Sequence, residues 1–331
     1  MPVNNMVSLE FITKQLLKAD RTAILPHVEA DGDAVGSSLA LCLAMKKCGK
    51  EAFVLLEEKI SGNYDFLPHG EETFVYGDKT GFSLVVALDT GDMPRLGKRA
   101  GVLKEAALSI NIDHHATNTG FAIYNHVDIK KSATGEIIYE IIKKMGCKAD
   151  KDIAECLYTA ISTDTGSFRY ANTNTSTHIM AAELLETGID QAEISRKVFD
   201  IVSYSKAKLA GLAASSLELV DCGKIALITL TAGMLAETGA REEDCEGLVN
   251  IGRNVEGVEV AVMIREKIGP EPMNIKVNFR SNTDADVSRI ASAFGGGGHA
   301  KAAGCVFSGT MAGARDDVIN EIRKEIERVT G

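Results

Sequence analysis

Eight carboxylate and imidazole side chains fall in four short segments of the chain, which read ILPHVEADGD, VVALDTGD, INIDHH and ISTDTG. They are His27, Asp31, Asp33, Asp89, Asp113, His114, His115 and Asp164. A divalent cation of hard to borderline character prefers this mixture of oxygen and imidazole ligands. The set offers seven ligand positions, which is more than one cation needs, whereas two cations that share a bridging carboxylate would use all seven. Such a pair can clamp the attacking and leaving oxygens of a phosphoryl group.

Each segment follows an apolar element that would hold it in place. Residues 21–25 and 84–88 are apolar runs typical of buried parallel strands, and Ile110 and Ile112 lead to the third segment. The fourth segment follows a helix predicted over residues 152–162. Ligands of open α/β sheets bind beyond the carboxyl ends of the strands, so we expect the segments to converge there.

Some of these residues have simpler explanations when they are taken singly. Asp33 stands at the start of a predicted helix, where a carboxylate commonly caps free N–H groups. Asp89 or Asp164 alone could be an ordinary residue of a turn or a helix end. The adjacent His114 and His115 point in different directions, so one can bind a cation while the other faces a substrate. The recurrence of the pattern in four segments favours a metal site over these separate explanations.

A second signature, FGGGGHAKAAG, spans residues 294–304. Four successive glycines are not expected inside a helix or strand. Such a run either is a flexible loop or lets the backbone approach a ligand, with its N–H groups forming an anion nest. Upstream, an alternating strand over residues 275–279 ends at Arg280 and Ser281. The fork of an Arg side chain suits a phosphate because it donates two parallel hydrogen bonds.

The order H-x3-D-x-D, D, DHH and D resembles the DHH phosphoesterase superfamily. The resemblance implies two divalent ions, usually manganese, with Asp89 as the bridging ligand. Asp113 would orient the histidines without itself binding a cation, and His115 would contact the phosphoryl group or protonate the leaving oxygen. The implied ligands are His27, Asp31 and Asp89 for the first ion, and Asp33, Asp89, His114 and Asp164 for the second.

The glycine signature resembles the GGGH motif of the DHHA1 domain, in which an Arg-Ser pair and the glycine loop hold the nucleotide. The implied substrate-binding residues are Arg280, Ser281, Gly296, Gly297, Gly298 and His299. A DHH domain followed by DHHA1 is similar to the bacterial nanoRNase/pAp phosphatase family. This similarity implies hydrolysis of short oligoribonucleotides and removal of the 3′ phosphate from adenosine 3′,5′-bisphosphate (pAp).

Three other functions stay open at this point. Related DHH–DHHA1 proteins are phosphodiesterases for cyclic di-AMP or for linear dinucleotides such as pApA. Pyrophosphatases also use a DHH domain, but the glycine loop with its nucleotide contacts argues against that activity. A non-catalytic nucleotide sensor would have lost a metal ligand, and none of the expected ligands is missing.

Composition limits the partners and the location of the protein. The formal charge is −10, from 36 basic and 46 acidic residues, which argues against tight binding of long or duplex nucleic acid. The N-terminus lacks the basic and apolar regions of a signal peptide, and no apolar run reaches the roughly 20 residues of a membrane helix. The seven cysteines form no C-x2-C pair, as in a reduced cytoplasmic protein. A homodimer is compatible with the sequence but has no support in it.

At 331 residues the chain is long enough for two domains. We expect a DHH domain over residues 1–190, with a parallel sheet covered by helices on both faces, and a helical connector over 191–220. A smaller α/β DHHA1 domain would follow over 221–331, across a cleft from the first. For this domain the pattern predicts four strands and helices near 242–254, 284–294 and 311–329.

Overall fold

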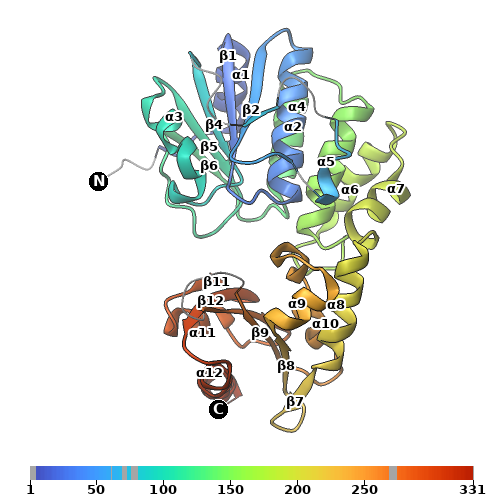
Figure 1. The fold of residues 1–331 in the computed structure, drawn as a ribbon. Helices are drawn as coiled ribbons and strands as arrows, with labels where there is room; N and C mark the ends of the chain where they lie inside the picture. Colours follow the sequence, from blue (N-terminus) through green and yellow to red (C-terminus); the bar gives the residue numbers. More distant parts are fainter. Residues whose placement is uncertain (1–4, 61, 69–72, 76–80, 268–273, 331) are drawn as a thin grey trace. The chain divides into compact units, whose positions relative to one another are not determined.

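The computed structural model describes residues 5–60, 62–68, 73–75, 81–267 and 274–330. The chain divides into two compact units, Met1–Ile201 and Val202–Gly331, and each contains a six-stranded sheet (Figure 1). The division falls inside the stretch predicted as a connector. That stretch contains α7 (Gln191–Ser195), a π-helical segment η3 (Arg196–Asp200) and α8 (Tyr204–Ser215).

The sheet of the first unit has the strand order β3-β2-β1-β4-β5-β6, and every neighbouring pair of strands is parallel. From β1 the chain adds strands outward on one side, and from β4 it adds them outward on the other. The strand order therefore reverses between β1 and β4, which is where ligands bind in open α/β sheets. The strands are β1 (Arg21–Pro26), β2 (Glu51–Leu56), β3 (Thr73–Val75), β4 (Leu84–Leu88), β5 (Ser109–Asp113) and β6 (Tyr124–Val127).

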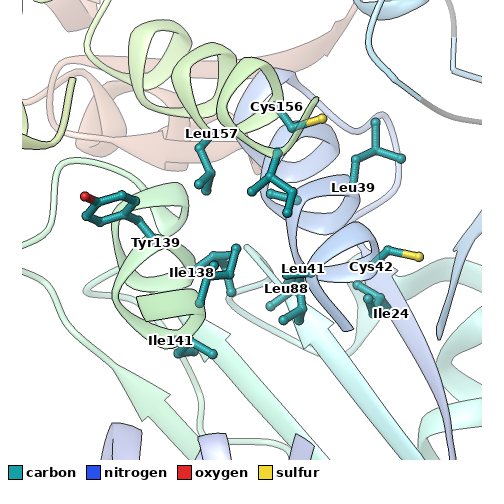
Figure 2. Close-up of a cluster of buried hydrophobic side chains, with 14 of the residues drawn as sticks. Ile24, Leu39, Leu41, Cys42, Leu88, Ile138, Tyr139, Ile141, Cys156 and Leu157 are labelled. Carbon is teal, nitrogen blue, oxygen red and sulfur yellow. The ribbon is translucent and has the colours of Figure 1, made fainter. Parts of the chain in front are cut away.

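Helices cover both faces of this sheet, as predicted. Successive residues of a strand point to opposite faces, so β1 sends Ile24 into one core and Ala23 and Leu25 into the other. The first core is shared with α1, α2, α4 and α5, and Figure 2 shows Ile24 and Leu88 of the sheet among side chains of the last three. The second core lies under η2 and α3. The helical segments are α1 (Leu9–Lys18), α2 (Gly32–Lys47), η1 (Gly62–Tyr64), η2 (Pro94–Arg99), α3 (Ala100–Glu105), α4 (Thr134–Lys144), α5 (Lys151–Asp164) and α6 (Thr175–Leu185).

Close packing of α2 against α5 brings two of the chemical segments together. The side chain of Asp31 caps α2 by accepting hydrogen bonds from the backbone N–H groups of Asp33 and Ala34. A Cβ atom at Gly36, one turn into α2, would lie 2.4 Å from the carbonyl oxygen of Cys156 in α5. Only glycine permits this approach. A Cβ atom at Gly32, the first residue of α2, would likewise lie 2.4 Å from Cγ2 of Thr163, so the start of α2 lies beside the end of α5.

The second unit has a mixed sheet in the order β11-β12-β10-β9-β8-β7, in which β8 and β9 are parallel and the other neighbours antiparallel. Helices α11 and α12 pack on one face, and α8, α9 and α10 pack on the other. The strands are β7 (Glu218–Val220), β8 (Ile225–Leu230), β9 (Val260–Glu266), β10 (Asn274–Ser281), β11 (Gly297–His299) and β12 (Ala302–Ser308). The helical segments are α9 (Ala232–Thr238), η4 (Glu242–Cys245), α10 (Val249–Arg253), α11 (Val287–Ala293) and α12 (Met311–Thr330).

Three of these elements, β7, α9 and β11, were not predicted from the sequence. The expectation that the glycine run avoids strand structure was wrong in part, because Gly297–His299 pairs with β12. The hydrogen bonds of the hairpin offset the low strand propensity of glycine. Among the described residues, no helix combines the length and apolar character needed to cross a membrane.

Candidate metal centre

The sheet places the first two chemical segments side by side. Pro26 and Leu88, the last residues of β1 and β4, are register partners, so His27 and Asp89 leave the sheet together. Nε2 of His27 lies 3.7 Å from Oδ2 of Asp89. The third segment follows the neighbouring β5, which ends at Asp113. The predicted convergence at the carboxyl ends of the strands is confirmed.

The first group of possible ligands consists of His27, Asp31 and Asp89, whose ligand atoms lie within 4.8 Å of one another. Nε2 of His27 is 3.7 Å from Oδ1 of Asp31. The other ring nitrogen, Nδ1, lies 2.7 Å from the carbonyl oxygen of Val28 and must donate to it, since a carbonyl only accepts. This bond fixes the tautomer that leaves the lone pair of Nε2 available to a cation.

The second group consists of Asp33, His114 and Asp164. Nε2 of His114 lies 3.3 Å from Oδ2 of Asp164 and 4.0 Å from Oδ2 of Asp33. Nδ1 of His114 donates to the carbonyl oxygen of Lys131 at 3.2 Å, so this ring also presents Nε2 to the carboxylates. The two histidines are thus oriented in the same way by backbone carbonyls.

Asp89 joins the two groups. Its Oδ2 faces His27, while its Oδ1 lies 3.6 Å from Nε2 of His114 and 3.5 Å from Nδ1 of His115. The side chain is only 2% exposed, and its backbone has a φ of 52°, which residues other than glycine rarely adopt. A strained residue at the junction of two ligand groups fits the bridging position implied by the family resemblance.

The start of α4 orients the carboxylates and was not anticipated from the sequence. The backbone N–H groups of Thr134 and Gly135 donate to the two carboxylate oxygens of Asp33 at 2.6 and 2.9 Å. The hydroxyl of Thr134 donates to Oδ1 of Asp89 at 3.0 Å. A helix N-terminus carries partial positive charge and stabilises carboxylates placed there. The segment SATGE holds no obvious sequence signal for this role, because Asp33, whose carboxylate it binds, is distant in sequence.

The electrostatics of the centre fit the binding of divalent cations. Burial, with the negative charges of Asp89 and Asp164 adding to it, raises the pKa of Asp33 well above its usual range. Burial also raises the pKa of Asp164 to about 7, although the neighbouring His114 opposes the shift. The raised pKa values show that these crowded carboxyl groups ionise unfavourably without a nearby positive charge. A divalent ion would supply that charge, and imidazole and carboxylate donors suit such an ion.

His115 and Asp113 form a pair beside the ligand groups. Nδ1 of His115 lies 2.7 Å from Oδ1 of Asp113, which is fully buried. Burial opposes protonation of His115, but this bond and the charges of Asp89 and Asp113 raise its pKa to about 9. Oδ2 of Asp113 accepts from Nδ2 of Asn118 at 2.6 Å, a contact that the sequence did not reveal. Asn118 also donates to Asn111 of β5, so the pair is anchored to the sheet.

Of the predicted substrate-binding residues, Arg280 and Ser281 lie on β10, Gly297–His299 form β11, and Gly296 directly precedes β11. Arg280 of β10 and His299 of β11 both pair with Ala302 of the intervening β12. Directly paired residues of antiparallel strands share a face, so the two side chains lie on one face with a small residue between them. Ser281 is buried, and its hydroxyl donates to the carbonyl of Thr283 at 2.9 Å.

The glycines of the loop have different roles. A Cβ atom at Gly296 would lie 2.2 Å from the carbonyl oxygen of Gly304, and one at Gly298 would lie 2.5 Å from that of Ala302. Both glycines are therefore needed for packing against β12 itself. Gly297, Gly298 and His299 are all exposed, so a ligand can approach this part of the loop. A Cβ at Gly297 would meet nothing within 4 Å, so packing does not require glycine at that position.

Comparisons with known proteins agree with this architecture. The N-terminal domain model of the DHH family matches residues 21–161, and the DHHA1 domain model matches residues 224–330. The "Bifunctional oligoribonuclease and PAP phosphatase NrnA" of Thermus thermophilus is 36% identical over 318 residues, which cover 92% of this chain and 90% of that protein. The protein of the same name from Bacillus subtilis is 27% identical over 281 residues, covering 84% of this chain and 86% of that one.

A solved structure is also similar along nearly the whole chain. It is an exopolyphosphatase-related protein from Bacteroides fragilis, with a TM-score of 0.91 and 28% identity, and the match covers 98% of this chain and 97% of the other. The match to a relative above 30% identity over nine-tenths of both chains shows the family. The chain belongs to the DHH family of phosphoesterases and carries a DHHA1 domain in its second unit.

Proposed function

We propose that this protein is a two-metal phosphohydrolase that degrades short oligoribonucleotides to mononucleotides and dephosphorylates pAp to AMP. The names of the relatives from T. thermophilus and B. subtilis support this activity. The family resemblance implies a preference for oligomers of about two to five nucleotides, and an acidic chain offers no extended basic track for a longer strand. Substrates of this kind arise where RNA is turned over, so we assign the protein to the cytoplasm.

Two divalent ions, which we assign as manganese, would be held by the ligand groups described above. His27, Asp31 and Asp89 would hold the first ion, and the second would share Asp89. The remaining ligands of the second ion would be Asp33, His114 and Asp164. When bound, such a pair lowers the pKa of a water nucleophile and stabilises negative charge on the phosphoryl oxygens.

The chain itself supplies proton transfer and substrate positioning. His115, held through Nδ1 by Asp113, can present a proton on Nε2 to the leaving oxygen of the cleaved ester. A protonated imidazole suits that role because the leaving oxygen gains negative charge. In the second unit, Arg280 and His299 would bind the nucleotide part, together with Ser281 and the loop Gly296–Gly298.

The observation that carries the proposal is the position of Asp89, a buried carboxylate whose two oxygens face two separate histidine-containing groups. A single structural ion would need neither the second group nor the shared residue. The pairing of the groups is what a two-ion phosphoryl transfer requires.

One assay tests the activity and its alternative together. Purified protein loaded with Mn²⁺ would be given pAp, pApA, cyclic di-AMP and labelled RNA of increasing length. We expect the highest kcat/KM for pAp and the shortest RNAs. A clear preference for cyclic di-AMP would replace the proposal by the cyclic-dinucleotide phosphodiesterase. No turnover of any member, with nucleotide binding intact, would make the protein a sensor.

A further inference from the structure

We propose that Arg95 binds a substrate phosphate that flanks the one being cleaved, such as the 5′ phosphate of pAp; this role rests on the proposed function. Arg95 lies in η2, shortly after the bridging Asp89. Its terminal nitrogen Nη2 lies 3.2 Å from Nδ1 of His27. The guanidinium therefore adjoins the first ligand group, although no motif of the sequence drew attention to it.

The backbone of Arg95 is held firmly while its side chain is exposed. Its carbonyl oxygen accepts from the backbone N–H of Val28 at 2.8 Å, and its own N–H donates to Oδ1 of Asp92 at 3.1 Å. Gly97 has a φ of 57°, and a Cβ there would lie 2.7 Å from Cγ1 of Val28. These contacts fix η2 against the loop that follows β1. The base of the Arg95 side chain is thus placed in advance, which reduces the entropy lost when the guanidinium binds an anion.

The contact of Arg95 with His27 engages no more than one of the five N–H donors of the guanidinium. Throughout the described parts of the chain, no carboxylate forms an ion pair with Arg95. By contrast Lys131, whose carbonyl supports the second group, is paired with Glu140. Arg95 therefore retains its charge and its fork of donors beside an acidic centre.

The chemistry of the Arg95 guanidinium favours a phosphate as its ligand, and its location favours a phosphate next to the one being cleaved. A guanidinium fork matches two oxygens of a phosphate, and such charge-assisted bonds are among the stronger ones in proteins. The ring of His27 separates the guanidinium from Nε2, the atom that faces Asp31 and Asp89. The oxygens of the cleaved phosphate belong on the Nε2 side of that ring. Arg95, on the Nδ1 side, is placed for a phosphate one step farther along the substrate.

Two substrates that differ only in the flanking phosphate test this role. Adenosine 3′-monophosphate is pAp without its 5′ phosphate. We expect the wild-type protein to prefer pAp in kcat/KM, and Arg95→Gln to lose about 10- to 100-fold for pAp, mainly in KM, as a charged hydrogen bond would contribute. Adenosine 3′-monophosphate should be affected less than threefold. Arg95→Lys should retain part of the preference, and Lys98→Gln, an exposed cation of the same η2 segment, should retain all of it.

A binding measurement separates this role from the proposed activity. Calorimetry should measure the binding of 5′-AMP and of adenosine to the metal-loaded protein. We expect Arg95→Gln to weaken the binding of 5′-AMP and to leave the binding of adenosine unchanged. If the wild type cleaves neither substrate, the proposed activity fails while this comparison still tests Arg95. Three results would each overturn the role of Arg95. Arg95→Gln could lower kcat/KM equally for both substrates, or it could lose bound metal. Alternatively, the preference for pAp could disappear in Arg280→Ala and persist in Arg95→Gln.

Discussion

Replacing Asp113 by Asn tests whether this buried carboxylate orients His115, and the hydrogen bonds allow the cost to be worked out. Oδ1 of Asp113 accepts from the backbone N–H of His114 at 2.8 Å and from Nδ1 of His115 at 2.7 Å, while Oδ2 accepts from Asn118 at 2.6 Å. An amide has one accepting oxygen and one donating nitrogen, so it cannot replace both carboxylate oxygens. In either orientation its NH2 group meets another donor. Asn118 cannot reverse its own amide without loss, because its Oδ1 accepts from the N–H of Gly120.

The substitution should therefore lower both stability and turnover. A buried donor left without an acceptor costs about 1–3 kcal/mol. For a unit of about 200 residues this corresponds to a fall of about 2–12 °C in Tm. Loss of the negative charge also removes the group that holds the proton-bearing ring of His115, so we expect kcat to fall by about 10²- to 10⁴-fold. Bound metal should stay unchanged, since Asp113 is not expected to be a ligand.

Turnover of pAp, thermal unfolding and metal analysis should be measured on the same preparations. Asp128→Asn is the matched control. Within the described part of the chain its carboxylate accepts a side-chain hydrogen bond only from the backbone N–H of Lys130, and it lies near the same strand end. If the two residues act as a unit, Asp113→Asn should add little to the loss caused by His115→Ala. Losses that multiply in the double variant, or a kcat within threefold of the wild type, would refute the reasoning.

Three further predictions test the other assignments. Hydrolysis should require a divalent ion, with Mn²⁺ best, and Asp89→Ala should lower it at least about 10³-fold, because both ligand groups lose their shared member; full activity in excess chelator would contradict this. His114→Ala should lose bound metal, whereas His115→Ala should keep it and lose about 10²- to 10⁴-fold in kcat, and metal analysis of the two variants decides the point. Arg280→Ala should slow the hydrolysis of nucleotide substrates far more than that of bis-p-nitrophenyl phosphate, since remote contacts matter only for substrates that make them; equal effects on both substrates would remove Arg280 from the binding site. RNA of about 24 nucleotides should be cleaved much more slowly than a dinucleotide.

The strand ends could be predicted because their signal is local. An apolar run followed by a carboxylate marks where a buried strand leaves the sheet, and β4 ends at Leu88 as the pattern before Asp89 indicates. Contacts between distant segments could not be predicted in this way. Thr134 reaches Asp33 across about 100 positions of the chain, and nothing in the residues around either one specifies the other. β11 was missed for the same reason, because its stability comes from pairing with β12 rather than from its glycines.

The start of α4 explains how the centre can bury so many carboxylates in a folded chain. Asp33 is only 1% exposed, yet both of its oxygens accept backbone hydrogen bonds from Thr134 and Gly135. A Cβ at Gly135 would lie 2.7 Å from Cβ of Ala160, so α4 packs too closely on α5 for any other residue at that position. The same packing holds Asp164, the last residue of α5, near His114. Helix packing and backbone hydrogen bonds thus hold the side chains of the centre in place, and a cation that binds to the folded centre stabilises it further.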